Sequence, residues 1–166
     1  LVVLLFAGGT SQQENDTTLK RAQQSMGQLR NLVQSMRRVL EDEQVQALAQ
    51  LALADKEKLN NLEQYVSGRV PDLISIELFG PQLDELRAEN LGPNGFAVLD
   101  MLWTAAESGE APLQVHSLGE TRYLGVAARL GDAENQMGYL LIRIDPKVLI
   151  STFSSSMSTP GDFALD

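Results

Sequence analysis

The chain has 166 residues, of which 43% are hydrophobic and 5% aromatic, so it suits a single domain with an aliphatic core. Its formal net charge of −9 argues against a duplex-binding protein, which needs a basic face to displace counterions. The absence of cysteine excludes disulfides, thiolate metal sites and a cysteine nucleophile in this chain. The acidic excess begins at Pro71, and we interpret it as a solvated surface.

Residues 1–9 form an uncharged apolar run. Nine helical residues span about 14 Å, roughly half of a hydrocarbon core, so this run alone cannot cross a bilayer. No basic region precedes it and no clear cleavage site follows, which argues against a signal peptide. We interpret residues 1–10 as the end of a transmembrane anchor, with a short buried strand as the alternative. No basic cluster directly follows the run, so we expect an inner-membrane protein whose domain faces the periplasm or the outside.

A long helix is predicted over residues 12–40, after the capping-box spacing of Ser11 and Glu14. Apolar residues recur along it at spacings of three and four. This seam consists of Ala22, Met26, Leu29, Val33, Met36 and Leu40. Such spacing is typical of coiled coils, so we predict a weak homodimer through Met26, Leu29, Val33, Met36 and Leu40. Part of the same seam must also cover a sheet.

An acidic segment at 41–44 interrupts the seam, and we interpret it as a helix junction rather than a cation site. A second helix is predicted from Val45 to about Ser67, ended by Gly68.

The rest of the chain alternates between strand and helix patterns. Strands are predicted at 73–79, 113–117, 121–130 and 138–144, and short helices at 94–108 and 146–153. On the helix 94–108 we expect one apolar face made of Phe96, Leu99, Leu102, Trp103 and Ala106. Short turns join the last three strands, which implies an antiparallel sheet. The fold class is therefore α+β, with the long helix and the second helix packed on an antiparallel sheet of about four to five strands.

Catalytic and cofactor motifs are absent from the sequence. His116 is the only histidine, so the usual Ser-His-Asp, zinc and haem arrangements lack parts, and we expect His116 at a surface or rim. No phosphate-binding loop of the Walker type occurs. We therefore expect no catalytic residue, metal or cofactor in this chain, although a catalytic domain could lie downstream.

Alternation along the last two strands predicts two different sheet faces. Leu124 and Val126 should face the long helix. The opposite face should carry Tyr123, Arg129, Tyr139 and Arg143 around small residues, under the helix that contains Trp103. Arginine and tyrosine around a Gly/Ala floor suit a small anionic ligand, so these five residues are the candidate ligand-binding set. The alternative is a solvated face on which Arg129 and Arg143 make surface ion pairs.

The element order, with Pro-Asp-Leu-Ile-Ser-Ile-Glu-Leu-Phe at 71–79 and Gly-Tyr-Leu-Leu-Ile-Arg-Ile-Asp at 138–145, resembles the single Cache family of bacterial extracytoplasmic sensor domains. The resemblance implies a PAS-like sheet packed on the long helix, with any ligand on the opposite face. Residues 11–153 would form the sensor domain with its helical stalk, and residues 154–166 a linker to a downstream region. Its amino-acid-binding pattern leaves Trp103, Tyr123 and Arg129 as positional candidates.

The chain is also similar to the N-terminal extension of membrane-anchored bacterial phosphomannomutase/phosphoglucomutase enzymes, whose phosphoserine and metal-binding loop it does not contain. Three functions follow: a membrane-anchored sensing or regulatory domain, a structural or dimerisation region of a larger enzyme, and an enzyme fragment with a site in the acidic half. We expect the first, and no nucleic-acid partner.

Overall fold

The computed structural model describes residues 7–92, 94–118 and 121–148. The chain divides into two compact units, one of residues 1–32 with 149–166 and one of residues 33–148. Helix α1 (Ala7–Glu41) supplies the described part of the first unit and the beginning of the second. Its start at Ala7 corrects the predicted start at residue 12, since a capping-box spacing also occurs inside helices. None of the helices described is both long and apolar enough to span a bilayer, and residues 1–6 of the predicted anchor lie outside the described ranges.

The predicted junction at 41–44 is confirmed at Asp42, which ends α1 and caps the next helix. The Asp42 carboxylate accepts hydrogen bonds from the backbone N–H groups of Gln44 at 2.8 Å and Val45 at 3.3 Å. These amides are among the free donors at a helix start, which explains why an aspartate stands there. Its second oxygen accepts a hydrogen bond from the Tyr65 hydroxyl at 3.3 Å. Asp42 therefore also fixes the junction to a later helix.

The single second helix predicted for 45–67 is wrong, because the chain forms α2 (Glu43–Ala54), the 3-10 turn η1 (Lys56–Lys58) and α3 (Leu59–Ser67). The break lies at Asp55, which has an extended backbone and accepts a hydrogen bond from the N–H of Glu57 at 3.0 Å. An aspartate that caps a new turn competes with continuation of the old helix.

The sheet consists of β1 (Leu73–Phe79), β2 (Glu110–Leu118), β3 (Thr121–Leu130) and β4 (Gly138–Ile144). Its strand order is β1-β4-β3-β2 and every neighbouring pair is antiparallel, which confirms the α+β fold class. Strand β2 begins at Glu110, three residues before the predicted start, and its extra residues include Pro112 beside a register shift. Proline is tolerated there because β2 is an edge strand. The predicted helix 146–153 lies mostly outside the described residues.

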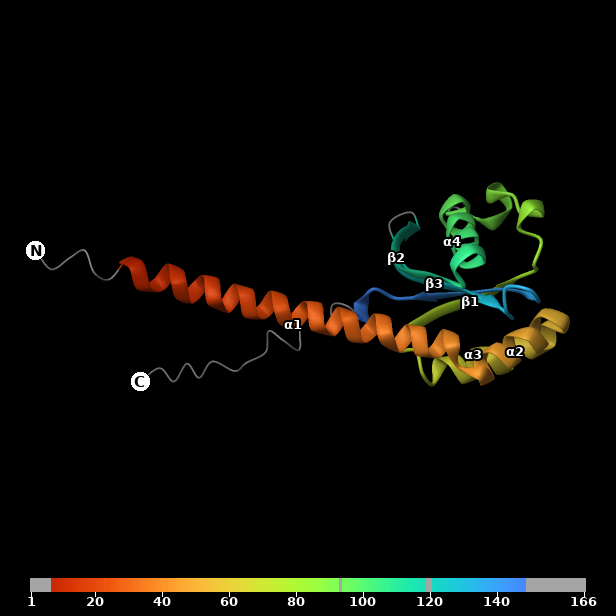
Figure 1. Ribbon diagram of the computed structural model, residues 1–166, viewed down its shortest axis with the longest axis horizontal. Coiled ribbons are helices and arrows are strands. Elements are labelled where there is room, and N and C mark those ends of the chain that lie inside the picture. Colours follow the sequence, from red (N-terminus) through yellow and green to blue (C-terminus); the bar gives the residue numbers. More distant parts are fainter. Residues whose placement is uncertain (1–6, 93, 119–120, 149–166) are drawn as a thin grey trace, which may run out of the picture. The chain divides into compact units, whose positions relative to one another are not determined.

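Helices cover both faces of the sheet in the unit 33–148. Helix α4 (Gly95–Ser108) lies on one face, beside the turns η2 (Leu83–Glu85) and η3 (Ala88–Leu91), and α2 and α3 lie on the other (Figure 1). Val126 shares a small groove with Met36 and Leu40, as predicted for the face toward the long helix. The α4 side has its own buried cluster, consisting of Leu83, Val98, Met101, Leu102, Ala105, Ala111, Ala127, Tyr139 and Leu141.

The predicted apolar face of α4 is rotated from the one that packs on the sheet. Phe96 is 78% exposed and Trp103 43% exposed. Leu102, from the predicted face, is fully buried, and so are Met101 and Ala105, which lie outside that face. Helix α4 is apolar around much of its circumference, so periodicity alone left its orientation open.

The predicted dimer seam of α1 is divided between burial and exposure. Met36 and Leu40 are buried within the unit 33–148, where they pack beneath the sheet. Met26, Leu29 and Val33 are exposed by 67%, 40% and 39% of their surfaces. The last two seam residues therefore belong to the core of this chain, and a second copy can contact only the earlier ones.

Candidate functional site

Side chains from all four strands meet on the α4 face of the sheet. Ser75 on β1 lies directly opposite Arg143 on β4, which lies opposite Gly125 on β3. Two residues further along β3, Tyr123 lies opposite His116 on β2. Side chains two residues apart on a strand share a face. We call the group Ser75, Glu77, His116, Tyr123 and Arg143 the polar cluster.

Arg143 is at the centre of the polar cluster. Its Nη1 donates a hydrogen bond to the carboxylate of Glu77, and the two side chains form an ion pair. Its guanidinium carbon lies 5.1 Å from the centroid of the Tyr123 ring, a cation–π geometry. The rings of His116 and Tyr123 are 5.4 Å apart between centroids. The Tyr123 ring thus lies against the guanidinium of Arg143, and His116 packs beside that ring. Glu77 binds one terminal nitrogen of the same guanidinium.

Four buried polar atoms of the polar cluster have no hydrogen-bond partner among the described residues. They are Ser75 Oγ, His116 Nε2, Tyr123 Oη and Arg143 Nε. Each buried polar atom left without a partner costs about 1–3 kcal/mol. Such atoms are rare in native proteins, so four of them on adjacent strands make the polar cluster the candidate site for a bound group or ordered water.

The floor of this site is Gly125, and a methionine of α4 fills the space above it. A Cβ atom at residue 125 would lie 3.1 Å from Sδ of Met101 and 3.5 Å from Cδ2 of His116. Met101 is fully buried. Because methionine is unbranched and adaptable, it can yield this space to a ligand more readily than a branched side chain could.

The pKa of His116 is changed by burial and by nearby charges, including that of Arg143. Burial lowers the pKa of His116 below its usual 6.5, and the positive charge of Arg143 lowers it further, while Asp100 acts in the opposite direction. The imidazole is therefore neutral at pH 7 and carries one N–H donor and one acceptor.

Arg129 and Tyr139 lie on the same sheet face, but at its other end. Arg129 Nη1 donates a hydrogen bond to the carbonyl oxygen of Ala106 at 2.8 Å, near the end of α4. The Tyr139 hydroxyl accepts a hydrogen bond from the Gln136 side-chain amide. Burial raises the pKa of Tyr139, against the effects of Gln136 and Arg129. Both predicted ligand residues thus have a partner within the chain, but Arg129 Nε is buried and has none among the described residues.

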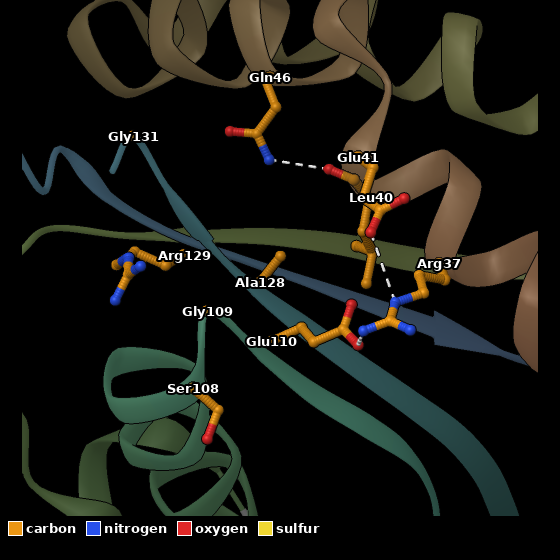
Figure 2. Close-up of a pocket in the computed structure, with 10 residues that line it drawn as sticks. All are labelled: Arg37, Leu40, Glu41, Gln46, Ser108, Gly109, Glu110, Ala128, Arg129 and Gly131. Atoms are coloured by element: carbon orange, nitrogen blue, oxygen red, sulfur yellow. Dashed lines mark hydrogen bonds and ion pairs between the residues drawn. The ribbon is translucent and has the colours of Figure 1, made fainter. Parts of the chain in front are cut away.

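A crevice of about 370 Å³ lies beside Arg129 (Figure 2). Arg37, from the last turn of α1, contacts Glu110 at 2.7 Å and Glu41 at 3.4 Å on its wall. Gln46 on α2 donates to the carbonyl oxygen of Leu40 at 2.8 Å. Arg37 is thus paired with the two glutamates, as Arg143 is paired with Glu77, and it offers the crevice little free positive charge.

The structure brings part of the predicted ligand-binding set together, and ligand binding by these residues stays a prediction. The structure brings Tyr123 and Arg143 together, places Arg129 and Tyr139 at the far end of the same face, and leaves Trp103 43% exposed. Sequence reasoning missed Ser75 and Glu77 and placed His116 at a rim. Alternation along 73–79 puts Ser75 and Glu77 on one face, but only the strand register shows which residues of β4 they meet.

No family model matches the sequence, and neither does any curated protein sequence. Among solved structures, the chain is similar to the sensor domain of the V. cholerae histidine kinase DctB, with a TM-score of 0.57 and 12% identity. The match covers 87% of this chain and 60% of the DctB sensor domain, so this chain spans less than two thirds of the length of that domain. This likeness confirms an α+β, PAS-like sensor-domain fold. None of these comparisons supports a link to phosphomannomutase/phosphoglucomutase enzymes.

Proposed function

We propose that this chain is an extracytoplasmic sensory or regulatory domain, of the Cache type, that binds a small anionic ligand at the polar cluster. The observation that carries the proposal is the set of four unpartnered buried polar atoms on one sheet face. All four side chains can donate a hydrogen bond, so a ligand rich in acceptor oxygens would satisfy them together. A carboxylate or phosphate group also matches the guanidinium of Arg143.

The fold and the sequence support the wider role. The similar structure in V. cholerae is the sensor domain of a histidine kinase, which supports a sensory role. The apolar run at residues 1–9 suits an anchor in the inner membrane. A topology reporter fused after the domain should give a periplasmic signal, and a cytoplasmic signal would refute this location.

The ligand-binding proposal is tested by a thermal-shift screen against small carboxylates, amino acids, sugars and sugar phosphates. At least one anionic compound should raise the melting temperature of the full chain, since a ligand that binds only the native state stabilises it. Arg143→Ala should weaken this compound about ten- to a hundredfold, because a lost charge-assisted contact costs roughly 1.5–3 kcal/mol. Arg122→Ala, an exposed arginine on β3, is the matched control. Equal affinity for both variants, or no stabilising compound, would refute the site.

The same screen distinguishes a ligand bound at the Arg143 end of the sheet face from a ligand bound at the Arg129 end. Because Arg129 donates to the end of α4, Arg129→Ala should lower the stability of the domain. If it also abolishes binding while Arg143→Ala does not, the ligand occupies the Arg129 end instead.

A second candidate function is a structural module that dimerises and spaces a larger membrane-anchored protein. The exposure of Met26 and Leu29 on α1 favours it, since a lone helix gains nothing by leaving an apolar seam in water. Leu29→Glu should abolish concentration-dependent mass in sedimentation, while Asn31→Glu, an exposed residue off the seam, should not. A wild-type chain that stays monomeric at high concentration would contradict this role.

A further inference from the structure

We infer that Glu77 is a built-in competitor that occupies Arg143 until an anionic ligand displaces it. The inference deepens the proposed function and rests on it, because it concerns regulation of the same site. Glu77 lies two residues beyond Ser75 on β1, and Ser75 faces Arg143 across the β1–β4 pair. The carboxylate of Glu77 therefore reaches the guanidinium from the neighbouring strand without any rearrangement of the backbone.

The ion pair between Glu77 and Arg143 uses only part of the hydrogen-bonding capacity of the guanidinium. Arg143 gives Nη1 to Glu77, while its Nε is buried and has no partner in the described part of the chain. A carboxylate that approached the guanidinium side-on would accept from Nε and a terminal nitrogen together, in the two-bond geometry that arginine favours. Glu77 leaves that second donor unused, so a better-placed anion has a geometric advantage over it.

Of the two partners, Glu77 is the one that can leave. Its side chain is 35% exposed, whereas that of Arg143 is 18% exposed and stacked over the Tyr123 ring. A released Glu77 carboxylate can turn toward water and recover its hydration. Arg143, in contrast, would lose its contact with the Tyr123 ring if it moved away. Binding is thus an exchange of one anion for another at a fixed guanidinium.

This exchange sets ligand specificity and affinity. A neutral compound cannot replace the charge of Glu77, so the site selects anions. The apparent affinity is reduced by the fraction of molecules in which Arg143 is free. If Glu77 occupies Arg143 about nine tenths of the time, its removal should tighten anion binding about tenfold.

The experiment titrates full-length wild-type and Glu77→Gln chains with sodium acetate and, separately, inorganic phosphate at constant ionic strength. The readout is the ¹⁵N NMR signal of the Arg143 Nε–H group, assigned by its loss in Arg143→Lys. Glu77→Gln should bind acetate or phosphate about tenfold more tightly than the wild type. Glu85→Gln, which removes an exposed carboxylate elsewhere, should match the wild type. If Glu77→Gln fails to fold, Glu77→Asp serves instead, because its shorter side chain withdraws from Arg143.

Each possible result of this titration either supports or refutes the role of Glu77 as a competitor. Equal dissociation constants for the wild type and the Glu77 variant, or no saturable Arg143 signal in either, overturn the competitor role. A ligand that binds the wild type through Arg143 but is indifferent to Glu77 leaves the proposed function standing without this inference. Tighter acetate or phosphate binding by the Glu77 variant, with no stabilising compound in the screen, supports the inference and excludes the screened compounds as the ligand of the proposed function.

Discussion

Replacing Tyr123 by phenylalanine should stabilise the ligand-free domain, the opposite of what loss of a buried hydroxyl usually does. Tyr123 is 3% exposed and its hydroxyl has no hydrogen-bond partner among the described residues. Because a buried, unpaired polar atom costs about 1–3 kcal/mol, its removal should raise the free energy of unfolding by roughly 1–2 kcal/mol. For a chain of this length that corresponds to a melting temperature about 2–8 °C higher.

Tyr139→Phe is a control matched in residue type, burial and sheet face. Tyr139 is 1% exposed, but its hydroxyl accepts a hydrogen bond from Gln136. Its removal should lower the free energy of unfolding by about 0.5–1.5 kcal/mol. Urea unfolding followed by circular dichroism, with melting curves without added ligand, measures both variants. If Tyr123→Phe destabilises the domain as much as Tyr139→Phe does, the hydroxyl of Tyr123 has a partner and the polar cluster loses its main support.

Three further predictions concern stability. Val126→Asp should unfold the domain in circular dichroism, because it puts a charge in the core, whereas Val115→Asp, at a residue 62% exposed, should leave it folded. Asp42→Ala should cost about 1–3 kcal/mol in urea unfolding through loss of the helix cap and a side-chain hydrogen bond, and an unchanged midpoint would refute the junction described for it. Since the pKa of His116 is lowered on folding, its contribution to stability is complete above about pH 6.5 and is lost as pH falls toward the folded value. Melting curves of His116→Gln should therefore show a shallower decline over that range, and identical slopes would contradict the shift.

The secondary structure was predictable where the apolar residues follow either the two-residue period of a strand or the 3.6-residue period of a helix, but not both. Strands β1, β3 and β4 have the predicted bounds, because alternating residues between turn-forming segments fit only an extended chain. The long helix was equally clear. The division of the predicted second helix at Asp55 was not clear, because the charged residues 55–58 also fit the exposed face of a continuous helix. Only the hydrogen bond that Asp55 accepts from the N–H of Glu57 shows that a new turn starts there.

The orientation of helices was less predictable than their existence. Helix α4 offers apolar residues on nearly all sides, and the predicted face included Trp103 but not Met101, whereas in the structure Met101 packs above Gly125. The same applies to α1, where a continuous seam continues from exposed Met26 to buried Leu40. An apolar seam on a helix indicates that its residues pack against an apolar surface. It does not indicate whether that surface belongs to the same chain or to another copy.

The attachment of α4 indicates how a ligand could enter a site that is filled in this structure. At its start, Gly95 packs so closely on Ala88 that a Cβ atom would lie 1.7 Å from the Ala88 carbonyl oxygen. At its end, Gly109 adopts a φ of 90° and its carbonyl oxygen accepts a hydrogen bond from the N–H of Arg129 at 2.9 Å. Both ends are thus held to the rest of the domain, and a hinged opening of the whole helix would break several contacts at once. The middle is held by side-chain packing alone, where Met101 fills the space above Gly125. For the ligand proposed above, entry would therefore require a change of the Met101 rotamer above Gly125 together with the release of Glu77 from Arg143.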